Sequence, residues 1–393
     1  MAQFHPPQLS LMALFLKFLR FGFLAFGGPV AQIAMIRQAL VDEERWIAPE
    51  RFNRLLAVLQ ILPGPEAHEL CVHLGMVARG RLGGLLAGLG FMLPGLALML
   101  LAGWLYVTWI AQDAALSGVL LGVQIVVLAI ILRAVVRIGQ HIVEDWLLAL
   151  IAVASLLATL AGVAFWILLA VGGLIYAFSH RPWLAVVVVV LALGAAVATH
   201  LLVAPDVPVA IGTGAPVTLV ALFVAGLKGG LLTFGGAYTA IPYVRADTVG
   251  RGWIGDATFL DGIALAGVLP APLVIFATFV GYVAGGPGGA LAITAGMFLP
   301  AFAFSLILFE RLEAVVENPA LHRILAGVAA AVVGIIAATF VQLGEATGAR
   351  VSYWLFGAIL FAAALAIVWR VKGAWVTPAL VAVGAVAGWL IAL

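Results

Sequence analysis

Long hydrophobic stretches, separated by short polar ones, run along the whole chain. Each stretch is close to the roughly 20 residues that a helix needs to cross a bilayer. The pattern therefore predicts an all-α polytopic membrane protein with about 13 transmembrane segments and broken helices. The expected segments are residues 9–30, 52–76, 82–106, 114–133, 146–161, 162–178, 183–203, 217–241, 255–284, 288–309, 323–342, 351–369 and 374–392.

Composition supports a membrane protein and excludes several other classes. Hydrophobic residues make up 65% of the chain and charged residues 9%, whereas a soluble domain carries about 25% charged residues. The net charge of +2 gives no indication of a nucleic-acid partner. Cys71 is the single cysteine, so an internal disulfide is excluded, and no Cys/His spacing resembles a zinc site. We expect no metal and no cofactor.

Several motifs occur twice at a nearly constant spacing, which indicates an internal duplication. Trp46 and Trp253 are 207 residues apart (253 − 46 = 207), and Pro94 and Pro300 are 206 apart (300 − 94 = 206). The segments thus fall in a six-one-six order, and the single middle segment inverts the second repeat relative to the first. The expected units are a first repeat over 1–182, a linking segment and loop over 183–216, and a second repeat over 217–393.

The basic residues predict the orientation of the chain. Eleven fall in loops of one predicted face and five in loops of the other. The face with eleven includes Arg133, the last residue of segment 114–133, and Arg137, which follows that segment. The positive-inside rule places that face in the cytoplasm, so we expect a cytoplasmic N-terminus and an external C-terminus.

Glycine and proline interrupt the hydrophobic pattern at four places, in register between the two repeats. A break within a membrane can begin a new helix, whose first N–H groups are free and whose dipole end is positive. That combination binds anions, and broken helices in inverted repeats follow the plan of secondary transporters. The alternative is that the breaks are ordinary kinks or close-packing glycines. The candidate residues are Phe26, Gly27, Gly28, Pro29, Pro63, Gly64, Pro65, Gly235, Gly236, Pro270, Ala271 and Pro272.

Two basic residues lie at equivalent depth in the two repeats. Arg20 and Lys228 each lie eleven residues into their segment, about 16 Å along a helix. A cation at that depth is costly and usually faces a cavity or a partner. We expect the pair to hold a divalent oxyanion; snorkelling or a structural ion pair is the alternative.

Polar side chains follow the first Pro-Gly-Pro, and apolar ones follow its counterpart in the second repeat. Glu66 and His68 can titrate, so they are candidates for proton coupling. A helix-capping carboxylate at Glu66 is the alternative. Gln124 stands alone in an apolar segment, and we expect it to make an interhelical hydrogen bond. The polar set is Glu66, His68, Glu69 and His73; the apolar set is Leu273, Val274 and Ile275.

Four motifs together resemble signature sequences of the chromate ion transporter family, and the two-repeat length matches its long-chain members. The resemblance covers nearly the whole chain. It implies a multi-pass protein of a prokaryotic inner membrane that moves chromate outward and confers chromate resistance, with sulfate as the structural analogue. One departure is Ala271, which stands where the first repeat has Gly64. The motifs are Phe26-Gly27-Gly28-Pro29, Leu62-Pro63-Gly64-Pro65-Glu66-Ala67, Thr233-Phe234-Gly235-Gly236-Ala237-Tyr238 and Leu269-Pro270-Ala271-Pro272-Leu273-Val274-Ile275-Phe276.

The leading hypothesis is therefore a secondary transporter for a tetrahedral dianion, with its site between two inverted repeats. An anion channel would share the cations but show conductance without coupling. A membrane-embedded enzyme using Glu66 and His68 is disfavoured, because no nucleophile or metal-ligand set accompanies them. The expected partners are the oxyanion, the lipid bilayer and, as an open alternative, a second copy of the chain.

Overall fold

The computed structural model describes residues 6–26, 28–61, 64–110, 116–181, 216–233, 237–308, 319–371, 373 and 375–392, with isolated positions 183, 187 and 190. Within these residues the chain is helical, with no β-strand. The expected segment 183–203 lies outside the described residues, apart from the isolated positions. The all-α prediction is thus confirmed for the described part.

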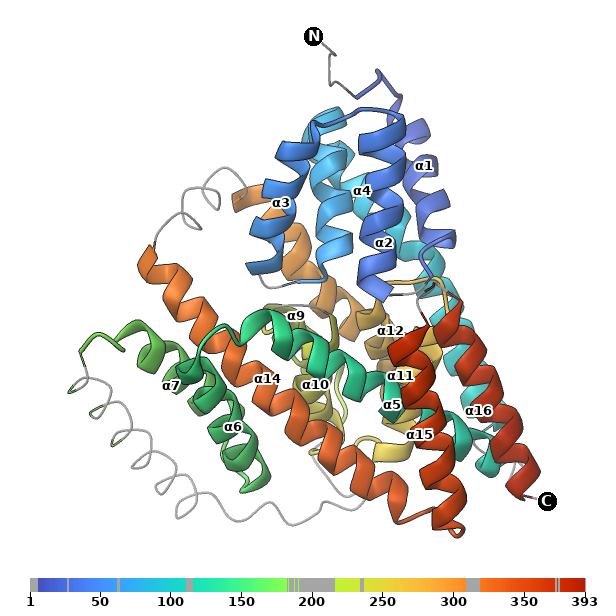
Figure 1. Ribbon diagram of the computed structural model, residues 1–393. Coiled ribbons are helices and arrows are strands. Elements are labelled where there is room, and N and C mark those ends of the chain that lie inside the picture. Colours follow the sequence, from blue (N-terminus) through green and yellow to red (C-terminus); the bar gives the residue numbers. More distant parts are fainter. Residues whose placement is uncertain are drawn as a thin grey trace.

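The first expected segment, 9–30, is two helices rather than one continuous span. The chain runs down α1, breaks at the first glycine pair, and returns along α2 and the π-helical turn η1 (Figure 1). Lys17 in α1 pairs with Glu44, which follows η1, and the Lys17 Nζ lies 5.3 Å from the centre of the Trp46 ring. These contacts join α1 to the segment that follows η1, while α1 itself packs along α4. Their bounds are α1 Leu11–Phe23, α2 Gly28–Arg37 and η1 Gln38–Glu43.

The next two expected segments, 52–76 and 82–106, are also divided differently. Helix α3 (Pro49–Ile61) ends at the Pro-Gly-Pro break, and α4 (Glu66–Thr108) begins after it. Helix α4 then reverses direction at Arg79 and Gly80, where Gly80 has φ 63°. A glycine is needed there because other residues rarely adopt positive φ.

The second half repeats this path with the same backbone angles. Its reversal is at Gly285 (φ −143°, ψ 22°) and Gly286 (φ 64°, ψ −163°), and the first is at Arg79 (φ −145°, ψ 32°) and Gly80 (φ 63°, ψ −160°). The offset is 286 − 80 = 206, the value found for the sequence motifs. The elements are α9 Leu219–Leu231, η3 Ala237–Thr239, α10 Ala240–Thr248, α11 Asp256–Val268, η4 Leu273–Ile275, α12 Phe276–Ala303 and η5 Phe304–Leu308.

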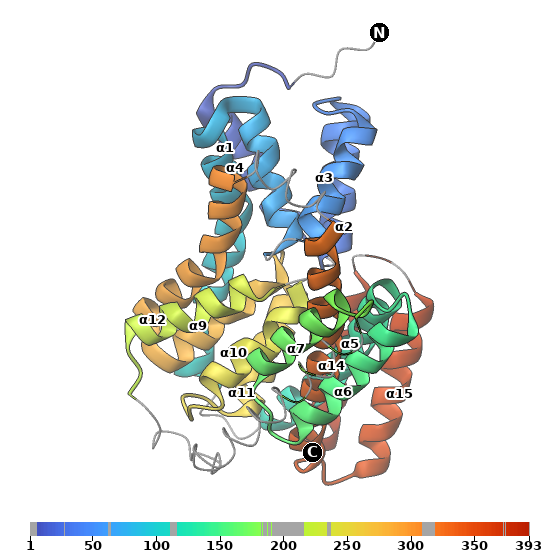
Figure 2. The same ribbon diagram turned by 90° about the vertical axis from the view of Figure 1, so that its left-hand side faces the viewer.

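The remaining helices are exchanged between the halves. Helix α5 packs against α15 and α16 of the second half, and its counterpart α14 packs against α6 and α7 of the first. Figures 1 and 2 both place α5 beside α15, and α14 beside α6 and α7. Glycines permit these close approaches: a Cβ on Gly122 of α5 would overlap the Gly384 carbonyl of α16, and a Cβ on Gly327 of α14 would overlap the Gly172 carbonyl of α7. The bounds are α5 Leu116–Ile142, α6 Trp146–Leu160, α7 Phe165–Ala177, α14 Pro319–Gly348, α15 Trp354–Arg370 and α16 Val376–Ala392.

Four of the described helices are long and apolar enough to cross a membrane, judged by length and composition: α4, most of α5, the η4–α12–η5 run and most of α14. Several shorter apolar helices accompany them. The count of about 13 segments stays a prediction. A further boundary differs from the prediction: α5 continues to Ile142, so Arg133 and Arg137 lie on this helix and not in a loop.

Candidate anion site at the helix breaks

The four breaks meet in two pairs, each formed by one break from either half. At the first junction, the Gly64 N–H donates to the Thr233 carbonyl at 2.8 Å. Thr233 lies two residues before the second glycine pair (235 − 233 = 2), so this bond joins the first Pro-Gly-Pro to the second glycine break. At the second junction, Gln32 Nε2 donates to the carbonyls of Ala25 and Ala271, both at 2.8 Å. That bond joins the first Gly-Gly break to the second Pro-Ala-Pro. Each junction thus joins the two halves through a hydrogen bond to a backbone carbonyl, donated by the Gly64 N–H at the first and by the Gln32 side chain at the second.

Each junction pairs one glycine with one alanine, and the two residue types are exchanged between the junctions. At the first, Gly64 faces Ala301, and a Cβ added to Gly64 would lie 3.4 Å from the Ala301 Cβ. At the second, Ala271 faces Gly95, and a Cβ added to Gly95 would overlap the Ala271 Cβ. Gly95 corresponds to Ala301 (301 − 95 = 206) and Gly64 to Ala271 (271 − 64 = 207). Alanine is therefore tolerated at 271 because its facing residue is glycine.

The predicted helix starts are present where they are described. Helix α2 begins at Gly28, which has φ 78°, with Pro29 as its second residue. Pro65 immediately precedes α4, and Pro272 precedes η4. Phe26 stacks on Trp375, with ring centres 5.6 Å apart. Gly27, Pro63, Phe234, Gly235 and Gly236 lie outside the described residues.

The two predicted cations lie in the last turns of α1 and α9, seven residues before the glycine pairs (27 − 20 = 7 and 235 − 228 = 7). Arg20 is exposed. Lys228 Nζ donates to Asp247 Oδ1 at 3.1 Å, and the same oxygen accepts from Arg251 at 2.9 Å. For Lys228 the alternative of a structural ion pair is thus realised in this conformation. A role of Arg20 and Lys228 in holding the substrate stays a prediction.

Two cations that the sequence predicted in a loop lie on α5 instead, and their charges reach residues next to the first junction, although burial has the larger influence on those residues. The charges of Arg133 and Arg137 on α5 act on Tyr238, which follows the second glycine pair. Arg137 also acts on Glu66, the first residue of α4. The two arginines are four residues apart on one helix, so they share a face. Their spacing was the available signal, but it shows only if the helix is extended past residue 133.

The polar residues at the start of α4 are buried. Glu66 is 9% exposed, and a carboxylate in a first turn suits the positive end of the helix. The His68 ring is fully buried and packs edge-on against Phe298 and Phe302, with centres 4.9 and 4.7 Å away. Glu69 is also fully buried, and neither of its carboxyl oxygens has a hydrogen-bond partner.

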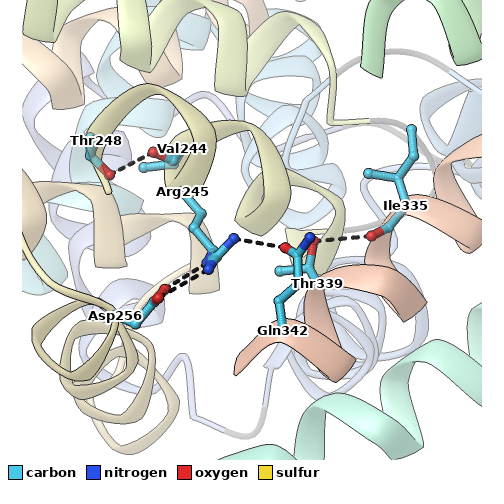
Figure 3. A network of polar contacts seen from close by, with 7 residues as sticks. All are labelled: Val244, Arg245, Thr248, Asp256, Ile335, Thr339 and Gln342. Carbon is cyan, nitrogen blue, oxygen red and sulfur yellow. Dashed lines mark hydrogen bonds and ion pairs between the residues drawn. The ribbon is translucent and has the colours of Figure 1, made fainter. Parts of the chain in front are cut away.

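Two further polar networks brace the second half. Arg245 of α10 donates to both Asp256 oxygens, at 2.6 and 3.0 Å, and to Gln342 of α14 at 2.7 Å (Figure 3). In the other, Asp261 of α11 is a buried acceptor. It accepts hydrogen bonds from Tyr106 at 2.9 Å and from Gln124 at 2.8 Å.

The interhelical bond expected of Gln124 is therefore confirmed. Gln124 also accepts from Arg350 at 3.0 Å, so the network ties α4, α5, α11 and the end of α14 together. These contacts position the helices around the junctions.

Comparison with known proteins decides the family. A family model described as a chromate transporter matches residues 12–178 and again residues 220–389. The chain belongs to the chromate transporter family. No solved structure matches it.

Curated relatives span the same length. The chain is 56% identical to a chromate transport protein of Pseudomonas aeruginosa, over 98% of this chain and 94% of the relative. It is 30% identical to a chromate transport protein of Cupriavidus metallidurans, over 86% and 84%. It is 28% identical to a probable chromate transport protein of Synechococcus elongatus, over 97% and 96%.

Family membership confirms the resemblance found in the motifs. The relatives are transport proteins and not enzymes, which agrees with the expectation that this chain is not an enzyme. Together with its apolar helices, the family makes the chain a multi-pass membrane protein of the anion-transporting type.

Proposed function

We propose that the chain is a secondary transporter that moves chromate outward across a prokaryotic inner membrane, with sulfate as its structural analogue. The family and the descriptions of the relatives support the substrate. The observation that carries the mechanism is the pairing of the breaks, because each junction joins one break from either half. An anion held there touches both halves at once.

A dianion needs compensation when it leaves water. A helix N-terminus supplies only about half a positive charge, so full cations are required as well. Arg133 and Arg137 are suited to this role, since their charges act on residues of the first junction. Arginine also grips an oxyanion with two parallel hydrogen bonds. Arg20 and Lys228, in the last turns of α1 and α9, are the second proposed pair.

Transport requires the two halves to move relative to each other around the bound anion. The Gly64–Thr233 and Gln32–Ala271 contacts are the bonds that such a movement would break and remake. Coupling of this movement to a proton needs a titratable group beside the first junction, and the sequence offers Glu66 and His68 as candidates. An anion channel, the alternative, would use the same cations without this exchange.

The direct test is uptake of labelled chromate and labelled sulfate into inverted membrane vesicles, with and without a proton gradient. We expect chromate uptake that exceeds the vector control, competition by sulfate, and dependence on the gradient. Uptake equal to the vector control would refute the proposal. Conductance with no dependence on a gradient would favour the channel.

Four glutamine variants can show which of the basic residues bind the anion. The measurement is chromate-induced thermal stabilisation of each variant in detergent. We expect Arg133→Gln and Arg137→Gln to weaken chromate binding at least about tenfold, the equivalent of 1.4 kcal/mol. Arg370→Gln, at the exposed end of α15, is the matched control. If Arg20→Gln and Lys228→Gln keep the parent's stabilisation, the second pair is structural.

We also propose the orientation inferred from the basic loops, with the N-terminus cytoplasmic and the C-terminus external. The orientation rests on the eleven basic residues that the sequence places on one face against five on the other. Reporter fusions at the two ends should read opposite sides. Two reporters on the same side would contradict the inverted repeat. Native mass spectrometry of the purified protein would test whether it forms a homodimer.

A further inference from the structure

Glu69 occupies an unusual position beneath the first junction. Its side chain is fully buried and neither carboxyl oxygen has a hydrogen-bond partner. A Cβ built on Gly64 would lie 2.5 Å from Glu69 Oε1, so the carboxyl group lies directly against the break. Gly64 in turn donates to Thr233 of the other half. The carboxyl therefore lies where the two halves touch.

No cation among the described residues bonds to this carboxyl group. Glu66, three residues earlier on α4, acts on Glu69 by like charge, and Arg137 of α5 acts on Glu66 instead. On the neighbouring elements, Phe298 and Phe302 of α12 pack against the His68 ring. The charge of Arg51 on α3 interacts electrostatically with His73. An ionised carboxylate without a partner is very costly in such a place. These surroundings therefore favour the neutral acid form of Glu69 over the carboxylate.

The second half has no equivalent group. The residue that corresponds to Glu69 is Phe276 (276 − 69 = 207), which is buried in the same position after the second Pro-x-Pro. A phenylalanine satisfies the packing there, so the fold itself does not require a carboxyl group. The acid in the first half is an addition to a scaffold that can do without it.

We propose that Glu69 is the proton-binding residue of the transport cycle, which rests on the transport function proposed above. With the first junction open to water on one side, the Glu69 carboxylate takes a proton from that water. Closure of the Gly64–Thr233 contact buries the neutral acid. Opening toward the other side lets the carboxyl group return the proton to water there, so one proton moves per cycle.

The test uses the full chain reconstituted in liposomes that contain a pH-sensitive dye. We expect chromate addition to change the internal pH with the parent and with Glu345→Gln, a control at an exposed carboxylate of α14. Glu69→Gln mimics the neutral acid and cannot release a proton. It should keep chromate-induced thermal stabilisation in detergent but lose the chromate-linked pH change at least tenfold. Glu69→Asp should retain the pH change at a lower rate.

Two outcomes would overturn the proposal: a parent that moves labelled chromate with no pH change, or a Glu69→Gln variant with the parent's pH change. A parent that moves no chromate would refute the proposed transport function, which is a different result from refuting the role of Glu69. If Glu69→Gln does not accumulate, the parent alone decides. With the membrane potential clamped, an imposed pH gradient must then alter chromate flux, and an unaltered flux overturns the proposal.

Discussion

The segments that follow the two Pro-x-Pro breaks share a backbone and differ in chemistry. Each starts at a break, runs as a short helix and reverses at a glycine with nearly the same φ and ψ, Gly80 or Gly286. The first buries Glu66, His68 and Glu69, whereas the second buries only apolar side chains from Leu273 to Phe276. The positions that are alike set the path of the chain. The shared backbone path is therefore separate from the titratable chemistry, which only the first of these two segments carries.

The largest expected effect is at Gly64, whose counterpart in the second half is Ala271. Gly64 has φ 151°, and a Cβ there would meet the Glu69 carboxyl group. Gly64→Ala should therefore abolish chromate transport, whereas Ala271→Gly should retain most of it and cost under about 1 kcal/mol. Vesicle uptake at matched protein levels is the measurement. Equal activity in the two variants would mean that the breaks are interchangeable.

The facing residues allow a rescue experiment at the second junction. Gly95→Ala should lose transport, because its Cβ would overlap that of Ala271. Adding Ala271→Gly removes the facing methyl and should restore at least half of the parent's uptake. The double variant then has the same arrangement as Gly64 and Ala301. A double variant as inactive as Gly95→Ala would show that the methyl overlap is not the cause.

The next prediction concerns the contribution of the Asp261 hydrogen-bond network to stability. Asp261→Ala leaves Tyr106 and Gln124 without their buried acceptor. We expect a loss of about 3 kcal/mol of stability, seen as a lower unfolding temperature in detergent. Tyr106→Phe removes one donor only and should cost about 1 kcal/mol. If Asp261→Ala unfolds at the parent's temperature, the network is not holding the helices.

His68 is polar but lies in an apolar environment, as the residues of the corresponding segment in the second half do. It lies between two phenylalanines, and its counterpart is Ile275. Because the pocket is apolar, His68→Leu should change stability by under about 1.5 kcal/mol and leave the pH dependence of transport unchanged. A flattened pH profile of uptake would instead restore His68 as a coupling residue.

The smallest expected effect concerns a helix cap that one half lacks. Asp145 Oδ1 accepts from the Leu148 N–H at the start of α6, while α15 starts after Tyr353 with no side-chain cap. Asp145→Ala should cost about 1 kcal/mol. The Leu148 N–H, and then the Tyr176 hydroxyl, hold the pKa of Asp145 below its usual 3.8.

The direction of the pH effect follows from that lowered pKa. The charged cap contributes fully above the usual pKa, and its contribution disappears as pH falls through the lower, folded value. The unfolding temperatures of parent and Asp145→Ala should therefore differ at pH 7 and converge in strong acid. A difference that persists in acid would contradict the cap.

Hydropathy predicted the helices well where a helix is simply apolar. The expected segments 146–161 and 351–369 correspond to α6 and α15 with small shifts at their ends. It ended α5 too early, because Arg133 and Arg137 resemble a polar loop when their tertiary surroundings are unknown. It also described 9–30 as one segment, since two short apolar helices have the same composition as one long helix.

The candidate site was predicted in its positions but not in its partners. Glycine and proline marked the breaks, because their backbone preferences are local. The pairing of Gly64 with Thr233 is a backbone contact between distant segments, so no side-chain pattern reports it. Glu69 could not be told from Glu66 by sequence, since the difference is one of burial and missing partners.

The exchange of α5 and α14 between the halves has a consequence for biosynthesis. Helix α5 is complete at Ile142, but its partners α15 and α16 begin only at Trp354. At ribosomal rates of about 5–20 residues per second, the 212 residues between these positions (354 − 142 = 212) take roughly 10 to 40 s. During that interval the nascent chain must keep a long apolar helix without its final neighbours. A ribosome that stopped before residue 354 would release a first half that could not be completed.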